Sequence, residues 1–176
     1  MHYWHGYDRL IAGIGEYYRS ETSPRQVFFH VVGGVASNEM NGSMHAPGFA
    51  TLIDKYGIKD YVIFHGQLFG EELDKVFNQS CFAIGSLARH RSGISVIKTL
   101  KNREYATRGI PFIYSEVDED FDHQSYVIKA SPDESPINIA QVIDFIDNYH
   151  FEPLDIRKTV EHLSWKIQME RVIDEA

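Results

Sequence analysis

The sequence predicts an α/β domain of the doubly wound type, in which a parallel sheet has helices on both faces. Short runs rich in β-branched and aromatic residues alternate with longer amphipathic runs. The amphipathic runs have the length that a crossover between parallel strands requires. The chain has 176 residues, 43% apolar and 24% charged, which is the size and composition of one globular domain.

The first elements are a helix and a buried strand. Segment 7–20 places Leu10, Ile11 and Ile14 at helical spacing. Segment 26–34 is a short apolar run that ends in two glycines, as expected for a strand buried on both faces. A doubly wound unit normally opens on a strand, so we expect residues before the first helix to be at most the end of one.

The middle of the chain continues the alternation. Segment 46–57 predicts a helix that stops at Gly57, and 61–66 predicts a strand. Segment 69–80 begins with acidic residues, which favour the positive amino end of a helix. Segment 81–87 is again apolar and predicts a strand.

The last third contains two strands and three helices. Segment 96–109 predicts a helix that ends at a glycine, and 110–116 predicts the buried strand after it. Segment 125–130 predicts a further short strand, and 136–149 an amphipathic helix. Segment 155–176 predicts one long closing helix.

Composition argues against several functional classes. The net charge of −8 disfavours a nucleic-acid backbone as the main partner. No apolar stretch approaches the ~20 residues that span a bilayer, and no signal peptide is evident. The single cysteine, Cys81, is expected to be buried, and it fits a reducing, cytoplasmic compartment. The nine histidines show no metal-binding spacing, and nucleotide-binding glycine fingerprints are absent.

Ligands of open α/β sheets bind at the carboxyl ends of the strands, so the turns that follow the strands are the first candidates for a site. Two of these turns carry glycines, which allow a ligand to approach the backbone. The turn after 81–87 carries Arg89, His90 and Arg91, and Ser92 and Gly93 follow. Cations beside free amides suit a diphosphate, whereas a turn can also be basic for solubility alone.

Helix 96–109 carries charges on an otherwise apolar side. Ile97, Leu100 and Glu104 fall on one face, and Lys101 lies beside them. One interpretation is a surface ion pair, extended by Arg108 four residues after Glu104. The other is a carboxylate that binds ligand hydroxyls and a lysine near phosphate. Spacing alone favours the surface ion pair.

Five motifs, in order, resemble the C-terminal domain of family 4 glycosyltransferases, which have the GT-B fold. "HGYDRLIAGI" is similar to the family's "KG-x-D-x-LI", and "VFFHVVGG" to its "L-x-IVG-x-G". The run from "LIDKYGIKDYVIFHG" to "CFAIGSL" looks like its central strand–helix–strand pattern. "LKNREYATRGIPFI" resembles "LK-x-x-EY-x-A-x-G-x-PVI", and "HLSWKIQMERVI" resembles the closing "fsW" segment.

The resemblance implies that 1–176 is a single domain that binds a nucleoside diphosphate sugar. It further implies that this domain is a fragment, one half of a GT-B enzyme, with the first strand and an acceptor-binding domain N-terminal to it. On its own, this half is expected to be inactive.

The resemblance also implies a set of substrate-binding residues and no metal ligand. Glu104 matches the second glutamate of the family's Glu-x7-Glu motif, which binds the nucleotide ribose, and Lys101 matches a lysine near the diphosphate. Val96 stands where the family has the first glutamate, which contacts the donor sugar, and His5 stands where the family has a lysine. No catalytic residue is assigned. The full set is His5, Gly33, Gly34, Gly66, Gln67, Leu68, Arg91, Ser92, Gly93, Ile94, Ser95, Lys101 and Glu104.

The function implied is retaining transfer of a sugar from a nucleoside diphosphate sugar to a saccharide or lipid-linked acceptor, in surface polysaccharide synthesis. No metal or other cofactor is expected, because helix amides and cations stabilise the departing diphosphate. Peripheral association with the inner face of the membrane is a further expectation for the full-length protein. The alternatives are a binding module without transfer activity and a sugar-nucleotide epimerase of similar shape.

Overall fold

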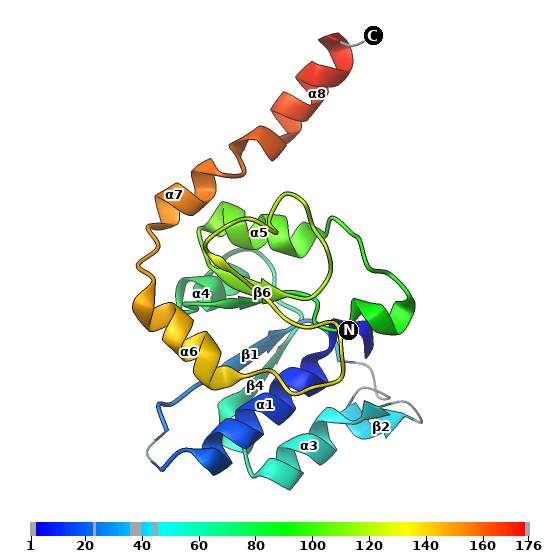
Figure 1. Ribbon diagram of the computed structural model, residues 1–176, viewed down its shortest axis with the longest axis vertical. Coiled ribbons are helices and arrows are strands. Elements are labelled where there is room, and N and C mark those ends of the chain that lie inside the picture. The colour runs from blue at the N-terminus through cyan, green and yellow to red at the C-terminus, as the bar shows by residue number, and fades with distance from the viewer. Residues whose placement is uncertain (1–2, 23, 36–39, 44–45, 175–176) are drawn as a thin grey trace.

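The computed structural model describes residues 3–22, 24–35, 40–43 and 46–174 (Figure 1). Short strands alternate with helices along the chain. The first half contains η1 (Tyr3–His5), α1 (Tyr7–Ser20), β1 (Phe29–Val32), β2 (Gly42–Ser43), β3 (Ala46–Pro47), α3 (Phe49–Tyr56), η2 (Lys59–Tyr61), β4 (Val62–Gly66) and α4 (Gly70–Asn78). The second half contains β5 (Ala83–Ile84), η3 (Arg89–Ser92), α5 (Leu100–Arg108), β6 (Phe112–Tyr114), β7 (Val127–Lys129), α6 (Ile139–Asn148), α7 (Pro153–Lys158), η4 (Glu161–Leu163) and α8 (Trp165–Asp174).

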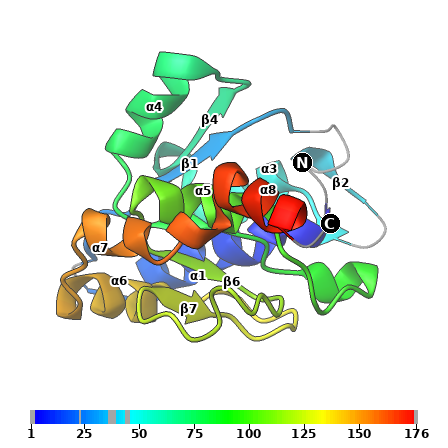
Figure 2. The same ribbon diagram turned by 90° about the horizontal axis from the view of Figure 1, so that it is seen from above.

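The expected mixed α/β architecture with parallel strands is confirmed, but the strands form more than one sheet. β1 pairs in parallel with β4, and β5, β6 and β7 form a second parallel sheet in that order. β2 and β3 form a two-residue antiparallel pair. Figure 2 shows β1 and β4 on one side of the molecule and β6 and β7 on the other. The single continuous sheet that the sequence predicts is therefore interrupted between β1 and β5 in the described residues.

Several helix boundaries agree with the sequence. α1 spans residues 7–20 as predicted. α3 and α5 end at Gly57 and Gly109, whose φ angles of 68° and 75° lie in the left-handed region that glycine adopts without strain. Residues 3–5 form a 3-10 helix rather than the end of a strand, and residues 1–2 lie outside the described part.

The predicted helix 96–109 begins four residues late. Val96 instead forms a parallel bridge with Val117, and the Ile97 amide donates to the Val117 carbonyl at 3.0 Å. Thr99 then caps α5 by accepting from the Asn102 amide. Pairing with a distant segment thus outweighs local helical periodicity at these positions.

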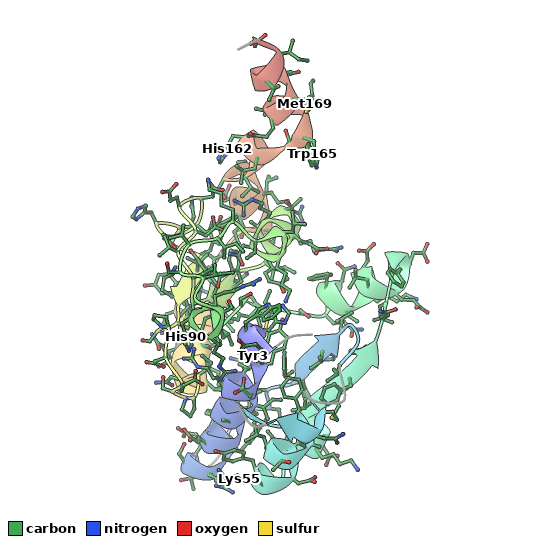
Figure 3. All side chains as sticks on the ribbon, turned by 90° about the vertical axis from the view of Figure 1, so that its right-hand side faces the viewer. Tyr3, Lys55, His90, His162, Trp165 and Met169 are labelled. Atoms are coloured by element: carbon green, nitrogen blue, oxygen red, sulfur yellow. The ribbon has the colours of Figure 1, made fainter. Side chains whose placement is uncertain are left out.

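In place of the predicted closing helix 155–176 the structure has α7, η4 and α8, and Ser164, which has an extended backbone, separates η4 from α8. α8 projects from the body of the molecule (Figure 1). Its side chains Trp165 and Met169 lie far from the two sheets (Figure 3), and Trp165 is 83% exposed. No helix in the described part of the chain is long and apolar enough to cross a membrane.

The main core forms around α1. α1 packs between α3 and α6, and its Leu10, Ile11 and Ile14 are buried. The same core takes Val31 from β1 and Ile113 from β6, so α1 covers one face of both sheets. A second core lies around Phe112, Tyr114 and Phe121.

Arg9 is a buried cation within this arrangement. Its side chain is 2% exposed, and the guanidinium donates to the carbonyls of Ser135 at 2.7 Å and Ser131 at 3.1 Å. It also donates to the Leu87 carbonyl and forms an ion pair with Asp133 at 3.1 Å. The buried charge is stabilised because every partner of the guanidinium is an oxygen acceptor.

We predict that Arg9→Met destabilises the protein by roughly 2–4 kcal/mol, because the buried Leu87 carbonyl and the partly buried hydrogen bonds to Ser131 and Ser135 lose their donor. Urea unfolding followed by circular dichroism measures this. Arg19→Met, on the exposed side of the same helix, is the matched control and should cost less than about 1 kcal/mol. Equal losses in the two variants would contradict the structural role of Arg9.

Candidate functional site

The glycine turns after β1 and β4 lie side by side. The Gly33 amide donates to the Gly66 carbonyl at 2.6 Å. Both glycines have positive φ angles, 114° and 71°, which a larger residue would adopt only with strain. Gly34 is next to the Gln67 side chain. Leu68, which follows Gln67 in the sequence, is half-buried. The turn residues predicted from the sequence therefore lie at the carboxyl ends of β1 and β4. They are Gly33, Gly34, Gly66, Gln67 and Leu68.

Lys101 lies against the first turn of α1. Its ammonium donates to the Tyr7 hydroxyl at 2.9 Å and lies 5.3 Å from the Tyr7 ring centroid. The Tyr7 ring stacks on the His5 ring, with centroids 5.5 Å apart and planes 14° apart. Two predicted residues, Lys101 and His5, are thus joined through Tyr7, which no sequence pattern singled out.

The amino end of α1 has anion-binding character. Gly6 precedes the helix in a left-handed conformation, and no side chain caps the first turn. Amides at the start of a 14-residue helix carry partial positive charge, and the Lys101 ammonium lies at the side-chain hydroxyl of Tyr7, the first residue of this helix. This combination suits a phosphate group.

Glu104 occupies the exposed face of α5. Its side chain is 46% exposed, and it pairs with Arg108 at 3.2 Å, as the surface ion-pair interpretation predicts. Arg108 also pairs with Asp74 at 2.8 Å. Leu100, on the same face, is 84% exposed, so this face is open rather than packed on a core. No ion pair joins Glu104 to Lys101 in the described residues.

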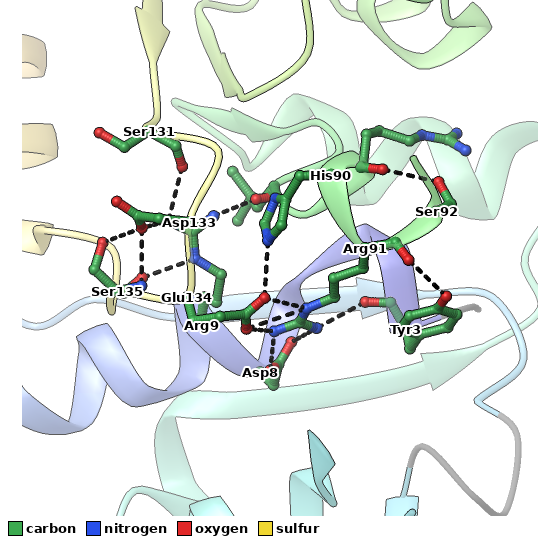
Figure 4. A network of polar contacts seen from close by, with 12 residues as sticks. Tyr3, Asp8, Arg9, His90, Arg91, Ser92, Ser131, Asp133, Glu134 and Ser135 are labelled. Carbon is green, nitrogen blue, oxygen red and sulfur yellow. Dashed lines mark hydrogen bonds and ion pairs between the residues drawn. The ribbon is translucent and has the colours of Figure 1, made fainter. Parts of the chain in front are cut away.

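The basic turn after β5 is held by internal contacts (Figure 4). The Arg91 guanidinium, whose side chain is 9% exposed, pairs with Asp8 at 2.8 Å and with Glu134. Hydrogen bonds from Arg91, aided by His90, lower the pKa of Glu134 to about 2. Arg91 therefore serves first to join this turn to α1 and to the loop before α6, because two carboxylates balance its charge.

Residues of the predicted loop 92–95 likewise form hydrogen bonds with the turn that precedes it. The Gly93 amide donates to the His90 carbonyl at 3.0 Å, and the Ile94 amide to the Arg89 carbonyl at 3.3 Å. The Ser92 hydroxyl donates to the Arg89 carbonyl. The Gly93 and Ile94 amides are therefore already hydrogen-bonded within the turn. The loop also lies several residues before the start of α5 rather than at its amino end.

Next in sequence to Val117, the bridge partner of Val96, is a buried carboxyl group that the sequence did not reveal. Val96 is 61% exposed and bridges to Val117. Glu116, the residue before Val117, is 3% exposed, and neither of its carboxyl oxygens has a hydrogen-bond partner of good geometry. Burial raises the pKa of Glu116, an effect only partly offset by its own amide and by the Arg89 charge. The pattern "IPFIYSE" read as strand, so it gave no signal for this residue.

A cavity lies elsewhere in the described part of the chain. It measures about 670 Å³ and lies at the amino ends of β5 and β6, beside Cys81, Pro111 and the connection between α6 and α7. Cys81 is exposed there, contrary to the expectation that it is buried. The described residues contain no group of three or more histidine, cysteine or acidic side chains that could hold a metal ion.

Comparison with known proteins adds no assignment. No protein-family model, no curated protein and no solved structure matches this chain.

We predict that Glu116→Gln raises stability by about 1 kcal/mol at pH 7.5, because it removes a buried charge that has no hydrogen-bond partner. A carboxyl whose pKa is raised by folding destabilises the protein only where it must ionise. The gain should therefore shrink as the pH falls from 7.5 to 4. Thermal unfolding at both pH values measures it.

The exposed neighbour Glu119 provides the control, and Glu119→Gln should change stability by less than about 0.5 kcal/mol at either pH. A Glu116→Gln variant less stable than the native protein at pH 7.5 would show that the carboxylate has a partner.

Proposed function

We propose that this chain is the donor-binding domain of a GT-B glycosyltransferase of family 4 type, with a Rossmann-like architecture. It would bind a nucleoside diphosphate sugar for retaining transfer to a saccharide or lipid-linked acceptor. The observation that carries the proposal is the contact between Lys101 and Tyr7 at the uncapped first turn of α1, with Glu104 on the exposed face of the same helix as Lys101.

The diphosphate would bind at the amino end of α1. The helix amides and the Lys101 ammonium supply positive charge, and the Tyr7 hydroxyl orients that ammonium. As the bond to the sugar breaks, negative charge grows on the diphosphate, and these fixed groups stabilise it. His5, stacked on Tyr7, supports the ring that holds Lys101.

The nucleoside would bind along α5 and the glycine turns. Glu104 can accept hydrogen bonds from two vicinal ribose hydroxyls once it gives up Arg108, and an exposed i,i+4 ion pair costs little to break. The turns at Gly33 and Gly66 present backbone rather than side chains, which lets a flat ring approach closely.

A second candidate, a nucleotide-sugar-binding module without transfer activity, is favoured by one observation. Val96 is an exposed apolar residue at the position where a sugar-contacting carboxylate would be expected, and the neighbouring Glu116 carboxyl is buried. A full-length protein that binds the donor but neither hydrolyses it nor transfers sugar would support the module.

We predict that calorimetry with UDP, GDP and ADP detects binding of at least one nucleotide, and that Glu104→Ala weakens its Kd roughly 10- to 100-fold through lost ribose contacts. Glu72→Ala, an exposed acidic residue on α4, is the matched control and should leave Kd unchanged. No binding by any of the three nucleotides, or equal binding by Glu104→Ala, would refute the assignment.

We further predict that Lys101→Met weakens binding of the nucleoside diphosphate at least ~10-fold but leaves binding of the corresponding nucleoside unchanged, because only the diphosphate needs the cation. Calorimetry on both ligands measures the difference. Equal losses for both ligands would place Lys101 in a structural role.

A further inference from the structure

The pairing of β1 with β4 is irregular just before the glycine turns. The two strands lie side by side (Figure 2), and their register is regular as far as Val31 and Phe64. The next pair joins Val32 to Gly66, so His65 is an extra residue without a partner in the ladder. Such a bulge disrupts the ladder locally. The contact between the ends of the two strands therefore depends on other groups as well.

The side chain of His65 supplies a further contact to β1. Its Nε2 atom lies 2.9 Å from Nδ1 of His30, within hydrogen-bond distance. The two rings are stacked, with centroids 5.2 Å apart and planes 15° apart, and both side chains are half-buried. One imidazole donates and the other accepts, because a neutral imidazole has one N–H and one nitrogen lone pair.

This histidine pair lies immediately before the contact that joins the two glycine turns. The Gly66 carbonyl belongs to the residue after His65, and it accepts from the Gly33 amide at 2.6 Å. Exchange of the Gly33 amide with solvent therefore reports whether the ends of β1 and β4 are together.

A hydrogen bond between two imidazoles tolerates one added proton but not two. The first proton can bind the other nitrogen of the donor ring, and the resulting imidazolium still donates to its neighbour. A second proton must bind the acceptor nitrogen, so that two N–H groups face each other. The two positive charges then repel at short distance, and the contact is lost.

No opposite charge offsets this repulsion in the part of the chain that the structure describes. Burial, followed by the charge of His65, lowers the pKa of His30. No aspartate, glutamate, lysine or arginine of the described strands, helices and turns acts on His30 in addition. His65 is thus the titratable group that faces it.

We propose that the pair of His30 and His65 is a pH-sensitive contact, which holds the bulge of β4 against β1 near neutral pH and releases it when both imidazoles are protonated. Release separates the Gly33 amide from the Gly66 carbonyl and opens the glycine turns. This inference does not depend on nucleotide-sugar binding.

The direction of the pH dependence follows from the pKa of His30. Because folding lowers this pKa, the contribution of the pair to stability is fully present above the ordinary value of 6.5. It is lost as the pH falls below that value, where the unfolded chain binds protons that the folded pair resists. The contact is therefore weaker at pH 5 than at pH 7.5.

Hydrogen exchange of the Gly33 amide at pH 7.5 and pH 5 measures the release. We expect its protection factor, which corrects for the intrinsic effect of pH on exchange, to fall at least ~10-fold at pH 5, the effect of one unit of pKa. The Ala83 amide, which donates to the Pro111 carbonyl in the other sheet, is the internal control and should change less than about 2-fold. NMR titration of the imidazoles should show one of the pair binding its proton only below about pH 5.5.

His65→Gln separates the hydrogen bond from the titration. A glutamine amide both donates and accepts but does not titrate, so the Gly33 protection factor of this variant should agree within about 2-fold at the two pH values. His123→Gln, which removes an exposed histidine, is the matched control and should lose Gly33 protection at pH 5 as the native protein does.

The imidazole titration and the exchange of the native protein keep the proposal testable even if His65→Gln does not fold. A Gly33 protection factor that is equal at the two pH values in the native protein would overturn it. So would an equal loss in His65→Gln, two imidazoles that both titrate near pH 6.5, or an Ala83 amide that loses as much protection as Gly33. None of these measurements uses a nucleotide, so failure here is distinct from failure of the proposed function.

Discussion

The buried guanidinium of Arg9 is the interaction on which the arrangement of this domain depends. It joins α1 to the chain beyond β5 through Leu87, and to the loop between β7 and α6 through Ser131 and Ser135. The Arg9 carbonyl also accepts from the Ile137 amide at 3.1 Å, so both ends of the residue hold the same loop. Through these contacts α1 becomes the common support of two sheets that do not pair with each other in the part of the chain that the structure describes.

The sequence predicted elements well where local periodicity and caps determine them, and less well where distant pairing does. α1 matches residue for residue, and Gly57 and Gly109 end their helices as expected. The predicted start of α5 was wrong because Val96 pairs with Val117, and no local pattern encodes a bridge to a residue 21 positions away. The division of the closing helix and of the sheet also depends on tertiary contacts, to which periodicity is insensitive.

The same distinction applies to the candidate site. The pair of Glu104 and Arg108 follows from helical spacing and is present. The contact of Lys101 with Tyr7 joins residues 94 positions apart, and the capture of Arg91 by Asp8 and Glu134 is equally long-range. Spacing reveals which charges share a helix, but charge balance depends on carboxylates that the fold brings from elsewhere. The burial of Glu116 could not be predicted, because it is set by tertiary packing and not by the local strand pattern.

The projection of α8 separates the environments of the two tryptophans. Trp4 is half-buried beside the Arg89 guanidinium, which lies 5.8 Å from its ring, whereas Trp165 is already surrounded by solvent. Indole emission moves to longer wavelengths in water, so Trp165 emits as it would in an unfolded chain. Fluorescence-detected unfolding therefore follows the region around Trp4, and fraying of α8 passes unseen by this probe.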